Sequence, residues 1–434
     1  MERTDFAKLT TLPGSPRAAT EADMVAGVSA QVVVEPETEE AVADILRYAS
    51  AEGLAVIPRG GATQLDYGAP PRRADIVLSM ARLNGVIEHA PHDLTVTVRT
   101  GARLADLQLM LGETRQWLAL DPPLAPGATI GGVIATSATG PRRQRYGGVR
   151  DQIIGVRVAL ADGMVARGGG KVVKNVAGYD LPKLYTGALG TLGVVLSASF
   201  RLYPVLPFSG SALVEAGALE SLCALSLATI ARPITPTIID IFPATAAAPA
   251  TLAIRFESAA REAISDQIEV VRRLASEAGF TARPLSGDEE IAWWRARDAW
   301  AAGAPTGDDA ETLAIKASVL PSDTGQFLAA LEEAGAASGA TADVRWRAHA
   351  GIGLVEARVA APPAAMAGWG VTIERLRAGA VARRGSVVVT RTPSALRGRV
   401  DPWGPVNGLE IMRSLKTRFD PQATLNPGRF VDGI

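Results

Sequence analysis

Two stretches of this sequence carry an unusual density of glycine and other small residues. "ATIGGVIATSATGPRRQRYGGVRD" occupies positions 128 to 151, and "GGGKVVKNVAGYDL" occupies positions 168 to 181. Neither has the order of strand, G-x-G-x-x-G and helix that marks a doubly wound dinucleotide-binding fold. Small residues at turns let a backbone come close to another surface. The two stretches therefore predict a fold whose loops approach a large, flat ligand.

Length, charge and cysteine content narrow the class of protein. A chain of 434 residues predicts two or three domains. The formal net charge of −1 makes nucleic acid and anionic membranes unexpected partners. Cys223 is the single cysteine, so no internal disulfide or cysteine-rich metal centre can form. Without a signal peptide or an apolar run of about 20 residues, we expect a cytoplasmic protein that reaches the inner membrane only through partners.

The first part of the chain alternates strands with helices. Strands are expected at 29–36, 54–58, 74–80, 85–90, 94–101 and 192–204. A helix beginning after Thr38 and ending at Gly53 joins the first two strands into a βαβ unit. The strands from 74 to 101 are expected to form a second, antiparallel-rich sheet. Residues 153–169 read as a hairpin with Asp162-Gly163 at its turn.

The pattern changes near Pro207, where strands and helices alternate in a way that suggests one sheet backed by helices. The predicted fold class is α+β. We expect an N-terminal extension (1–28), a first domain of two subdomains (29–206), an α+β substrate or cap domain with an antiparallel sheet (207–404), and a C-terminal helix and tail (405–434). The last segment is too short for its own core, so it is expected to return to the first domain.

Two glycine-rich turns have the shape of anion-binding sites. "PRGGATQ" (58–64) follows a strand directly, and "PGATIGG" (126–132) precedes the start of a helix. Such turns can point several backbone N–H groups inward, and a helix N-terminus also attracts a diphosphate. Either one alone is more often a plain tight turn. Their joint presence, with a third glycine cluster behind them, favours two turns that hold a pyrophosphate from both sides.

These motifs resemble a known family. "PRGGAT", "PGATIGGVIATSATG", "RYGGVRD" and "GALGTLGVV" are similar to the FAD-binding domain of the vanillyl-alcohol-oxidase, or para-cresol methylhydroxylase, type over roughly Gln31 to Pro204. "GPRR", "VKNVAGYDL" and the closing "RFDPQATLNPGRF" look most like the FAD-binding E subunits of bacterial glycolate oxidases. The resemblance implies an FAD-dependent oxidoreductase acting on CH–OH donors in glyoxylate metabolism.

The resemblance also implies which residues hold FAD. The first turn would contribute Pro58, Arg59, Gly60, Gly61, Ala62, Thr63 and Gln64, and the second Pro126, Gly127, Ala128, Thr129, Gly131 and Gly132. Ala135, Thr136, Thr139, Gly140, Gly193, Val194 and Asn426 would lie along the rest of the cofactor. Ala62 stands where many relatives have glycine, which requires its φ to be negative. Because neither turn has a histidine or cysteine that could attach the flavin, non-covalent FAD is expected.

The catalytic residues are harder to place. Relatives that oxidise D-2-hydroxy acids alone have "GHxGDGNLH" and a later "EHGxG", whose imidazoles bind a metal and take a proton. Here "AHAGIGLVE" (348–356) keeps His349 but has Glu356 in place of the second histidine, and the later motif has no counterpart. With only His89, His92 and His349 in the chain, no metal site is expected. Lys174, Asn175, Tyr179 and His349 are the weak candidates for catalysis, although a structural role suits His349 and Tyr179 at least as well.

Three functions fit these observations. In the first, the chain is a subunit of a glycolate oxidase that works with a second FAD subunit and an iron–sulfur subunit. In the second, it is an independent FAD-dependent dehydrogenase for a D-lactate-like 2-hydroxy acid. In the third, it holds FAD only for structural reasons. No residue that selects the substrate can be recognised from the sequence, so the substrate is not identified.

Overall fold

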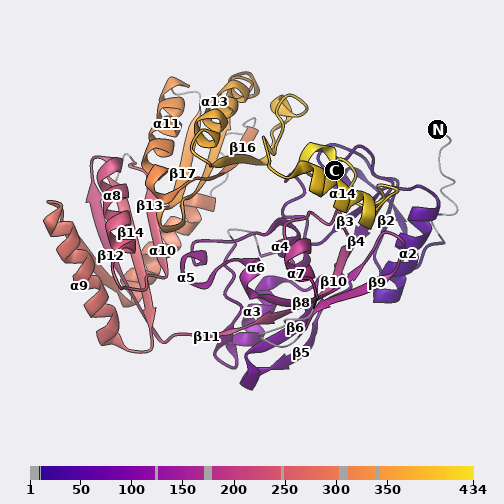
Figure 1. The fold of residues 1–434 in the computed structure, drawn as a ribbon, viewed down its shortest axis with the longest axis horizontal. Helices are drawn as coiled ribbons and strands as arrows, with labels where there is room; N and C mark the ends of the chain where they lie inside the picture. The colour runs from indigo at the N-terminus through magenta and orange to yellow at the C-terminus, as the bar shows by residue number, and fades with distance from the viewer. Residues whose placement is uncertain are drawn as a thin grey trace. The chain divides into compact units, whose positions relative to one another are not determined.

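The computed structural model describes residue 9 and residues 11–122, 126–170, 178–245, 249–302, 311–338 and 342–434. The chain divides into two compact units. The first contains Met1–Thr139, Gly147–Val205 and Val406–Ile434, and the second contains Gly140–Tyr146 and Leu206–Pro405. Both combine helices with sheets (Figure 1), and the predicted α+β class is confirmed.

The first sheet of the first unit has four strands in the order β1-β2-β4-β3. They are β1 (Arg17–Ala18), β2 (Val32–Val34), β3 (Val56–Arg59) and β4 (Ile76–Ser79). Helix α2 (Glu39–Ala51) begins as predicted, because Thr38 Oγ1 accepts a hydrogen bond from Ala41 N at 3.1 Å. Its buried stripe, Val42, Ile45 and Leu46, packs on this sheet. The placement of residues 74–80 in the second sheet was wrong, since β4 lies between β2 and β3 and runs parallel to both.

The second sheet is antiparallel, in the order β5-β6-β10-β8-β9. Its strands are β5 (Val86–Ala90), β6 (Thr95–Arg99), β8 (Ile153–Ala159), β9 (Val165–Gly169) and β10 (Val194–Arg201), and β7 (Gln116–Trp117) pairs separately with β11 (Tyr203–Pro204). The predicted hairpin is β8–β9. Gly163 takes φ +80° at its turn, and Leu160 N donates to Met164 O at 2.9 Å. The hairpin prediction is confirmed.

The C-terminal segment extends the first sheet. The helices of the unit are α2, α3 (Leu104–Gly112), α4 (Ile130–Thr136), α6 (Val149–Gln152), α7 (Leu181–Tyr185) and α14 (Leu409–Phe419). After α14 the chain runs beside β3: Val56 N donates to Thr424 O at 2.7 Å, and Asn426 N donates to Val56 O at 2.9 Å. Lys416 fixes this course, because its ammonium lies 2.6 Å from Asp420 Oδ2 and also donates to Leu425 O.

The second unit is built on one eight-stranded antiparallel sheet, in the order β15-β12-β14-β13-β17-β18-β16-β19. Its strands are β12 (Phe208–Ala216), β13 (Ile238–Phe242), β14 (Ala250–Ser258), β15 (Ala282–Ser286), β16 (Glu311–Ser318), β17 (Asp343–His349), β18 (Leu354–Ala361) and β19 (Ser386–Arg391). The strand β15 gives no strand signal in the sequence, because "ARPLS" lacks an alternating apolar pattern.

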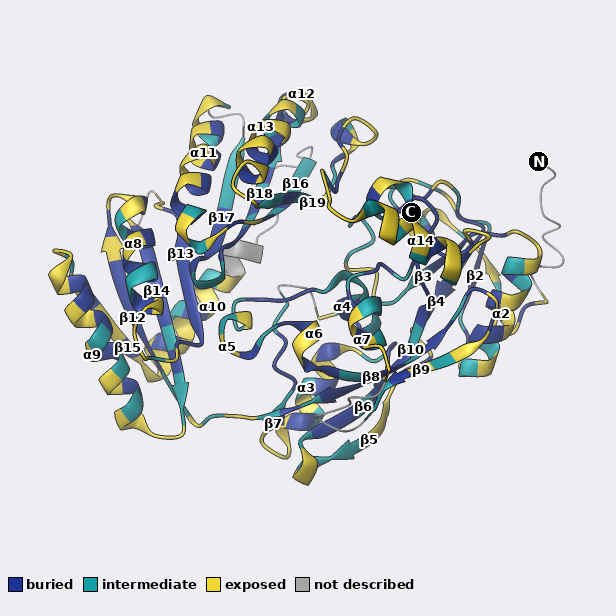
Figure 2. Ribbon diagram, in the orientation of Figure 1, coloured by how far each residue is buried: buried dark blue, intermediate teal, exposed yellow. Residues whose placement is uncertain are grey.

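The two faces of this sheet differ in chemistry. Helices α8 (Leu219–Ile230), α9 (Arg261–Glu277), α11 (Thr324–Ala337) and α13 (Trp369–Val381) share the apolar core of the first face, with α12 (Pro363–Met366) beside them. Figure 2 shows that the outer sides of these helices are exposed and that the strands they cover are buried. In β13, Ile239 and Ile241 join this core, so alternation places Asp240 and Phe242 on the second face. Helix α10 (Gly287–Ala302) packs there through Trp294.

One short segment belongs to the second unit although both of its flanks belong to the first. Helix α5 (Arg143–Tyr146) and the residues before it lie against β14. Arg142 Nη2 lies 2.9 Å from Glu257 Oε1, and Arg145 Nη1 donates to Glu257 O at 2.7 Å. Through these contacts the segment "GPRRQRY" packs on the sheet of the second unit. Among the described residues, no helix is long and apolar enough to cross a membrane.

Candidate functional site

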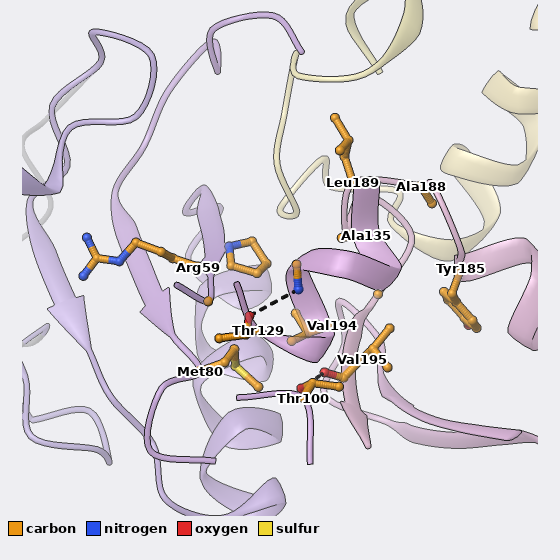
Figure 3. Close-up of a pocket in the computed structure, with 16 residues that line it drawn as sticks. Arg59, Met80, Thr100, Thr129, Ala135, Tyr185, Ala188, Leu189, Val194 and Val195 are labelled. Carbon is orange, nitrogen blue, oxygen red and sulfur yellow. Dashed lines mark hydrogen bonds between the residues drawn. The ribbon is translucent and has the colours of Figure 1, made fainter. Parts of the chain in front are cut away.

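A narrow cavity opens between the two predicted turns of the first unit (Figure 3). Its lining is almost entirely backbone and small or apolar side chains. The lining residues are Pro58, Arg59, Gly60, Met80, Thr100, Thr129, Gly131, Gly132, Ala135, Tyr185, Ala188, Leu189, Gly190, Gly193, Val194 and Val195. A wall of this kind can admit a ligand only through backbone contacts and close apolar packing.

The glycines of the two turns keep the turns in contact with each other. A Cβ atom on Gly60 would lie 2.0 Å from Thr129 Oγ1, and one on Gly61 would lie 1.7 Å from Gly127 O. In α4, a Cβ on Gly131 would lie 3.1 Å from Thr100 Cβ. The absent side chains therefore let the first turn approach the second.

The first turn has a run of free hydrogen-bond donors, unlike the first residues of α4. No described protein group accepts a hydrogen bond from the N–H groups of residues 60–64. In α4, by contrast, Ile130 N donates to Ala102 O, Gly131 N to Thr100 O, and Gly132 N to Thr129 Oγ1. A run of consecutive unpaired N–H groups is the arrangement that binds an anion. The first turn, rather than the N-terminus of α4, therefore has the donors for a diphosphate.

Backbone strain at Ala62 marks the same turn. Its φ is +58°, so the expectation that alanine requires a negative φ there was wrong. The left-handed conformation costs a non-glycine residue about 1–2 kcal/mol. A turn that retains this strain turns successive N–H groups toward one side, which is the geometry of an anion-binding nest.

The side chain of Arg59 does not line the cavity. Figure 3 shows it pointing away from the other lining residues, and its Nη1 lies 2.8 Å from Asp23 Oδ1. Asp23 is buried in a short 3-10 helix, where Arg17 and the Thr20 N–H also bind its carboxylate. The guanidinium of Arg17 and the other donors hold the pKa of Asp23 well below its usual range, although burial opposes them. Arg59 thus contributes backbone, not charge, to the cavity.

The structure places the predicted site residues in different parts of the molecule. Pro58, Arg59, Gly60, Thr129, Gly131, Gly132, Ala135, Gly193 and Val194 line the cavity. Gly61, Ala62, Thr63, Gln64, Pro126, Gly127, Ala128, Thr136, Thr139 and Asn426 belong to the same unit outside the lining, and Gly140 belongs to the second unit. Lys174 and Asn175 lie outside the described residues, and Tyr179 is 92 % exposed. Sequence reasoning missed Met80, Thr100 and Tyr185, which follow no glycine signal.

Asn426 brings the C-terminal segment to the rim of the cavity. Its Nδ2 donates to the carbonyl of Leu189, which lines the cavity, while its buried Oδ1 has no hydrogen-bond partner among the described residues. The Thr139 hydroxyl is a second buried polar group without a described partner. Together with the unpaired N–H groups and the glycine wall, these groups suit a large cofactor with a diphosphate and a polar, flat ring.

A second polar site lies on the second face of the sheet in the other unit. Asp240 in β13 is fully buried between two cations of β17. Arg347 Nε donates to Asp240 Oδ2 at 2.6 Å, and His349 Nδ1 donates to Asp240 Oδ1 at 2.7 Å. Arg347 also binds Asp298 of α10 at 2.7 Å. The Asp240 carboxylate therefore fixes the orientation of the His349 ring, with Nδ1 bound to Asp240 and Nε2 on the opposite edge of the ring.

Glu356 and Lys316 continue this row across β18 and β16. Glu356 lies opposite Arg347 on one side and Lys316 on the other. Its nearer carboxylate oxygen is 3.8 Å from His349 Nε2, beyond hydrogen-bond distance, and Nε2 has no partner among the described residues. Burial lowers the pKa of His349, but the charge and hydrogen bond of Asp240, with Glu356, outweigh it and raise the pKa to about 9. His349 is therefore a protonated donor at neutral pH.

The sequence matches two family models. The one described as the FAD-binding domain matches residues 30–169, and the one described as the C-terminal domain of FAD-linked oxidases matches residues 225–388 and 403–430. A solved structure of p-cresol methylhydroxylase with substrate bound has the same fold, with a TM-score of 0.75 at 16% identity over 98% of this chain and 95% of that one. The fold is therefore that of the para-cresol methylhydroxylase type.

Curated relatives agree with this class. The glycolate oxidase subunit GlcD of Bacillus subtilis is 36% identical over 172 residues, which are 40% of this chain and 37% of that protein. A D-lactate dehydrogenase of Archaeoglobus fulgidus is 38% identical over 174 residues, or 40% and 39%. An uncharacterized FAD-linked oxidoreductase of Mycobacterium tuberculosis is 28% identical over 91% of this chain and 89% of its own length. The first two matches thus span well under half of the relatives' lengths.

The chain belongs to the FAD-linked oxidoreductases with a para-cresol-methylhydroxylase-type FAD-binding domain, and its cofactor is FAD. Bound FAD supplies an acceptor for two electrons from an organic substrate. The first-turn N–H groups would hold its diphosphate, and the apolar wall of the cavity would pack against the rest of the cofactor. The chain also contributes, in its other unit, a row of charged side chains that FAD does not need.

Proposed function

We propose that the chain is the FAD-binding subunit of a glycolate oxidase or dehydrogenase. In this reaction glycolate, a small 2-hydroxy acid, loses two electrons and two protons and becomes glyoxylate. A second FAD subunit and an iron–sulfur subunit would carry the electrons away. The observation that carries the proposal is the charged row around His349 in the second unit, because FAD binding alone would not require it.

The relatives support the choice of substrate. One is named as a subunit of glycolate oxidase and another as a D-lactate dehydrogenase, and both names denote 2-hydroxy acids. Basic side chains near Glu356, namely Lys316, Arg358 and His349, outnumber its single carboxylate and suit a substrate anion. His349 is the residue that we assign to the substrate, while Tyr179 is too exposed to be held in one position.

The expected dependence of activity on partner subunits rests on the histidine that "AHAGIGLVE" lacks. Where the resembling motif has a second histidine, this chain has Glu356. Among the described residues, no group of three or more His, Cys, Asp or Glu side chains is arranged to hold a metal ion. A chain with a reduced set of catalytic groups is expected to turn over slowly unless a partner supplies the rest.

Flavin reduction in the isolated chain tests the proposal. The purified protein, loaded with FAD, is mixed without oxygen with glycolate, D-lactate, D-2-hydroxyglutarate and simple alcohols lacking a carboxylate. We expect slow bleaching by glycolate, and faster bleaching when the two other subunits are added. Fast bleaching by glycolate in the chain alone would overturn the dependence on partners. After denaturation all flavin should leave the protein, because no histidine or cysteine lies in either turn.

An independent dehydrogenase for a D-lactate-like acid is the second candidate. The Asp240–His349 pair favours it, because the chain then has its own buried proton-binding group. Rapid bleaching by D-lactate, with glycolate slow and no effect of partners, would select this function. A purely structural role for FAD would instead leave the activity of a complex intact when Gly131→Val has emptied the site.

A further inference from the structure

The C-terminal strap, residues 424–429, contacts the chain on both sides of the first glycine-rich turn. Before the turn, the N–H group of Val56 in β3 donates to Thr424 O at 2.7 Å, and the Val56 carbonyl accepts from Asn426 N at 2.9 Å. Leu425 pairs with Val56 in a parallel bridge. The strap therefore lies along the strand that leads into the turn.

After the turn, Arg429 holds the chain that leaves it. Its Nη2 donates to Leu65 O at 2.6 Å and to Tyr67 O at 2.7 Å, and its own carbonyl accepts from Ala69 N at 3.0 Å. Arg429 is 4 % exposed, so these hydrogen bonds are shielded from water. A charged donor that binds two carbonyl groups at once fixes the course of the chain between them.

The strap fits closely against the residues that follow the turn. Arg72 N donates to Pro427 O at 2.8 Å, and Gly428 has φ +90°. A Cβ atom on Gly428 would lie 2.6 Å from Arg72 Cγ. Because the two segments leave no room for a side chain at this point, the strap can dock only in one position.

The first turn has few contacts of its own that would fix its conformation. The N–H groups of residues 60–64 donate to no described protein group, and Ala62 keeps φ +58°. A strained conformation persists only where the surrounding structure imposes it. The second turn packs on the middle of this loop, whereas the strap closes its two ends through Val56 on one side and through Leu65 and Tyr67 on the other.

We propose that Arg429 is a positioning residue for FAD and that docking of the strap is coupled to cofactor binding. The inference rests on the placement of the FAD diphosphate at the first turn and does not depend on the substrate. With the strap docked, residues 60–64 turn their N–H groups toward one side. With the strap released, the two ends of the turn are no longer held together. Such coupling is reciprocal, so FAD stabilises the docked strap by the same factor by which the strap strengthens FAD binding.

Titration of the apoprotein with FAD tests one direction of this coupling. Arg429→Met should weaken binding about tenfold, because Leu65 O and Tyr67 O lose their donor and the end of the turn is released. Arg429→Lys keeps the charge but not the planar fork of donors, so it should recover only part of the affinity. Arg418→Met removes an exposed cation from the last turn of α14 and is the matched control, which should bind FAD as the wild type does.

Hydrogen exchange in the wild type tests the other direction and needs no variant. If the released strap does not bind FAD, free FAD suppresses its opening in proportion to concentration, about 100-fold at 100 times the Kd. The N–H groups of Val56, Ala69, Arg72 and Asn426 report on the strap, because each of them donates across it. The N–H groups of β5, at the edge of the second sheet, exchange by local opening and should not respond to FAD.

The outcomes separate this inference from the placement of FAD on which it rests. If Gly60→Val empties the flavin site while Arg429→Met binds FAD as the wild type does, the placement stands and the coupling is wrong. Exchange at Ala69, Arg72 and Asn426 that does not depend on FAD would also overturn the coupling. If Gly60→Val keeps its FAD, the diphosphate lies elsewhere and the inference falls with the placement. Thermal unfolding shows whether Arg429→Met is folded, and if it is not, the wild-type exchange decides.

Discussion

The two polar sites of this protein are formed by different groups: one by the backbone and the other by side chains. The first glycine-rich turn of the first unit is a contiguous stretch of backbone, with its unpaired donors in residues 60–64 and the Arg59 guanidinium turned away to Asp23. The charged row of the second unit is made of side chains from four strands, between Asp240 and Glu356 in the chain. A site formed by backbone groups requires residues that lack bulky side chains. A site formed by side chains requires that the strands carrying them are neighbours in the sheet.

This difference predicts opposite responses to substitution. In the first glycine-rich turn the damaging change is an added carbon atom, whereas loss of a charge should matter little. In the second unit the damaging change is loss of a charge, because its partners stay buried without compensation. Four substitutions or conditions test this contrast, in order of decreasing expected effect.

Gly60→Val and Gly131→Val should each empty the flavin site. The new Cβ at Gly60 would lie 2.0 Å from Thr129 Oγ1, and at Gly131 3.1 Å from Thr100 Cβ, so the second turn would have to move. Gel filtration followed by absorbance at the flavin band measures bound FAD. Gly112→Ala, at the end of α3 with no atom within 4 Å of the new methyl group, is the control and should retain all FAD. Wild-type flavin content in both valine variants would place the cofactor elsewhere.

Asp240→Ala should destabilise the second unit by about 3–5 kcal/mol while leaving FAD bound to the first unit. It leaves Arg347 and protonated His349 buried without their shared carboxylate. Chemical denaturation followed by tryptophan fluorescence reports on this unit, and flavin fluorescence reports on the other. Asp343→Ala removes a partly exposed carboxylate that pairs with Arg345 on the same strand, and it should cost less than about 1 kcal/mol. Equal costs for the two variants would contradict the assignment.

Raising the pH should weaken the second unit through His349. The pKa of His349 is about 9 in the folded state against 6.5 for an unperturbed histidine, so the folded state holds the extra proton between these values. The stabilisation is complete below pH 6.5 and is lost as the pH rises toward 9, by at most about 3 kcal/mol. Asp240, Arg347, Glu356 and Lys316 face the same group. In His349→Gln the slope of unfolding free energy against pH should disappear over this interval.

Arg59→Met should change FAD affinity least, by less than about threefold, because the guanidinium lies against Asp23 and not in the cavity. Asp23 keeps Arg17 and the Thr20 N–H as partners, so the stability cost should stay near 1 kcal/mol. Titration of the apoprotein with FAD measures the affinity. A tenfold loss would mean that Arg59 reaches the diphosphate after all.

The contrast also explains what the sequence could predict. Thr38, the Asp162-Gly163 turn and the glycine turns were readable because each depends on neighbours in sequence. The parallel placement of β4 and the positive φ of Ala62 were not, since strand order and the close contact of two turns decide them. Asp240 stands inside an ordinary apolar strand, "TIIDIF", and becomes notable only when β17 pairs with β13. The role of Glu356 likewise depends on register.

The course of the C-terminal segment beside β3 sets an order of events during synthesis. Residues 206–405 leave the ribosome before Thr424 and Asn426 can pair with Val56, so the second unit has nearly its whole sheet available while the first still exposes the edge of β3. The usual vectorial order, N-terminal domain first, is therefore reversed at the last step. An unpaired edge strand invites association with other chains, so a nascent chain that pauses before α14 is the species most exposed to aggregation. Completion of the first unit therefore waits until residues 406–434 have been synthesised.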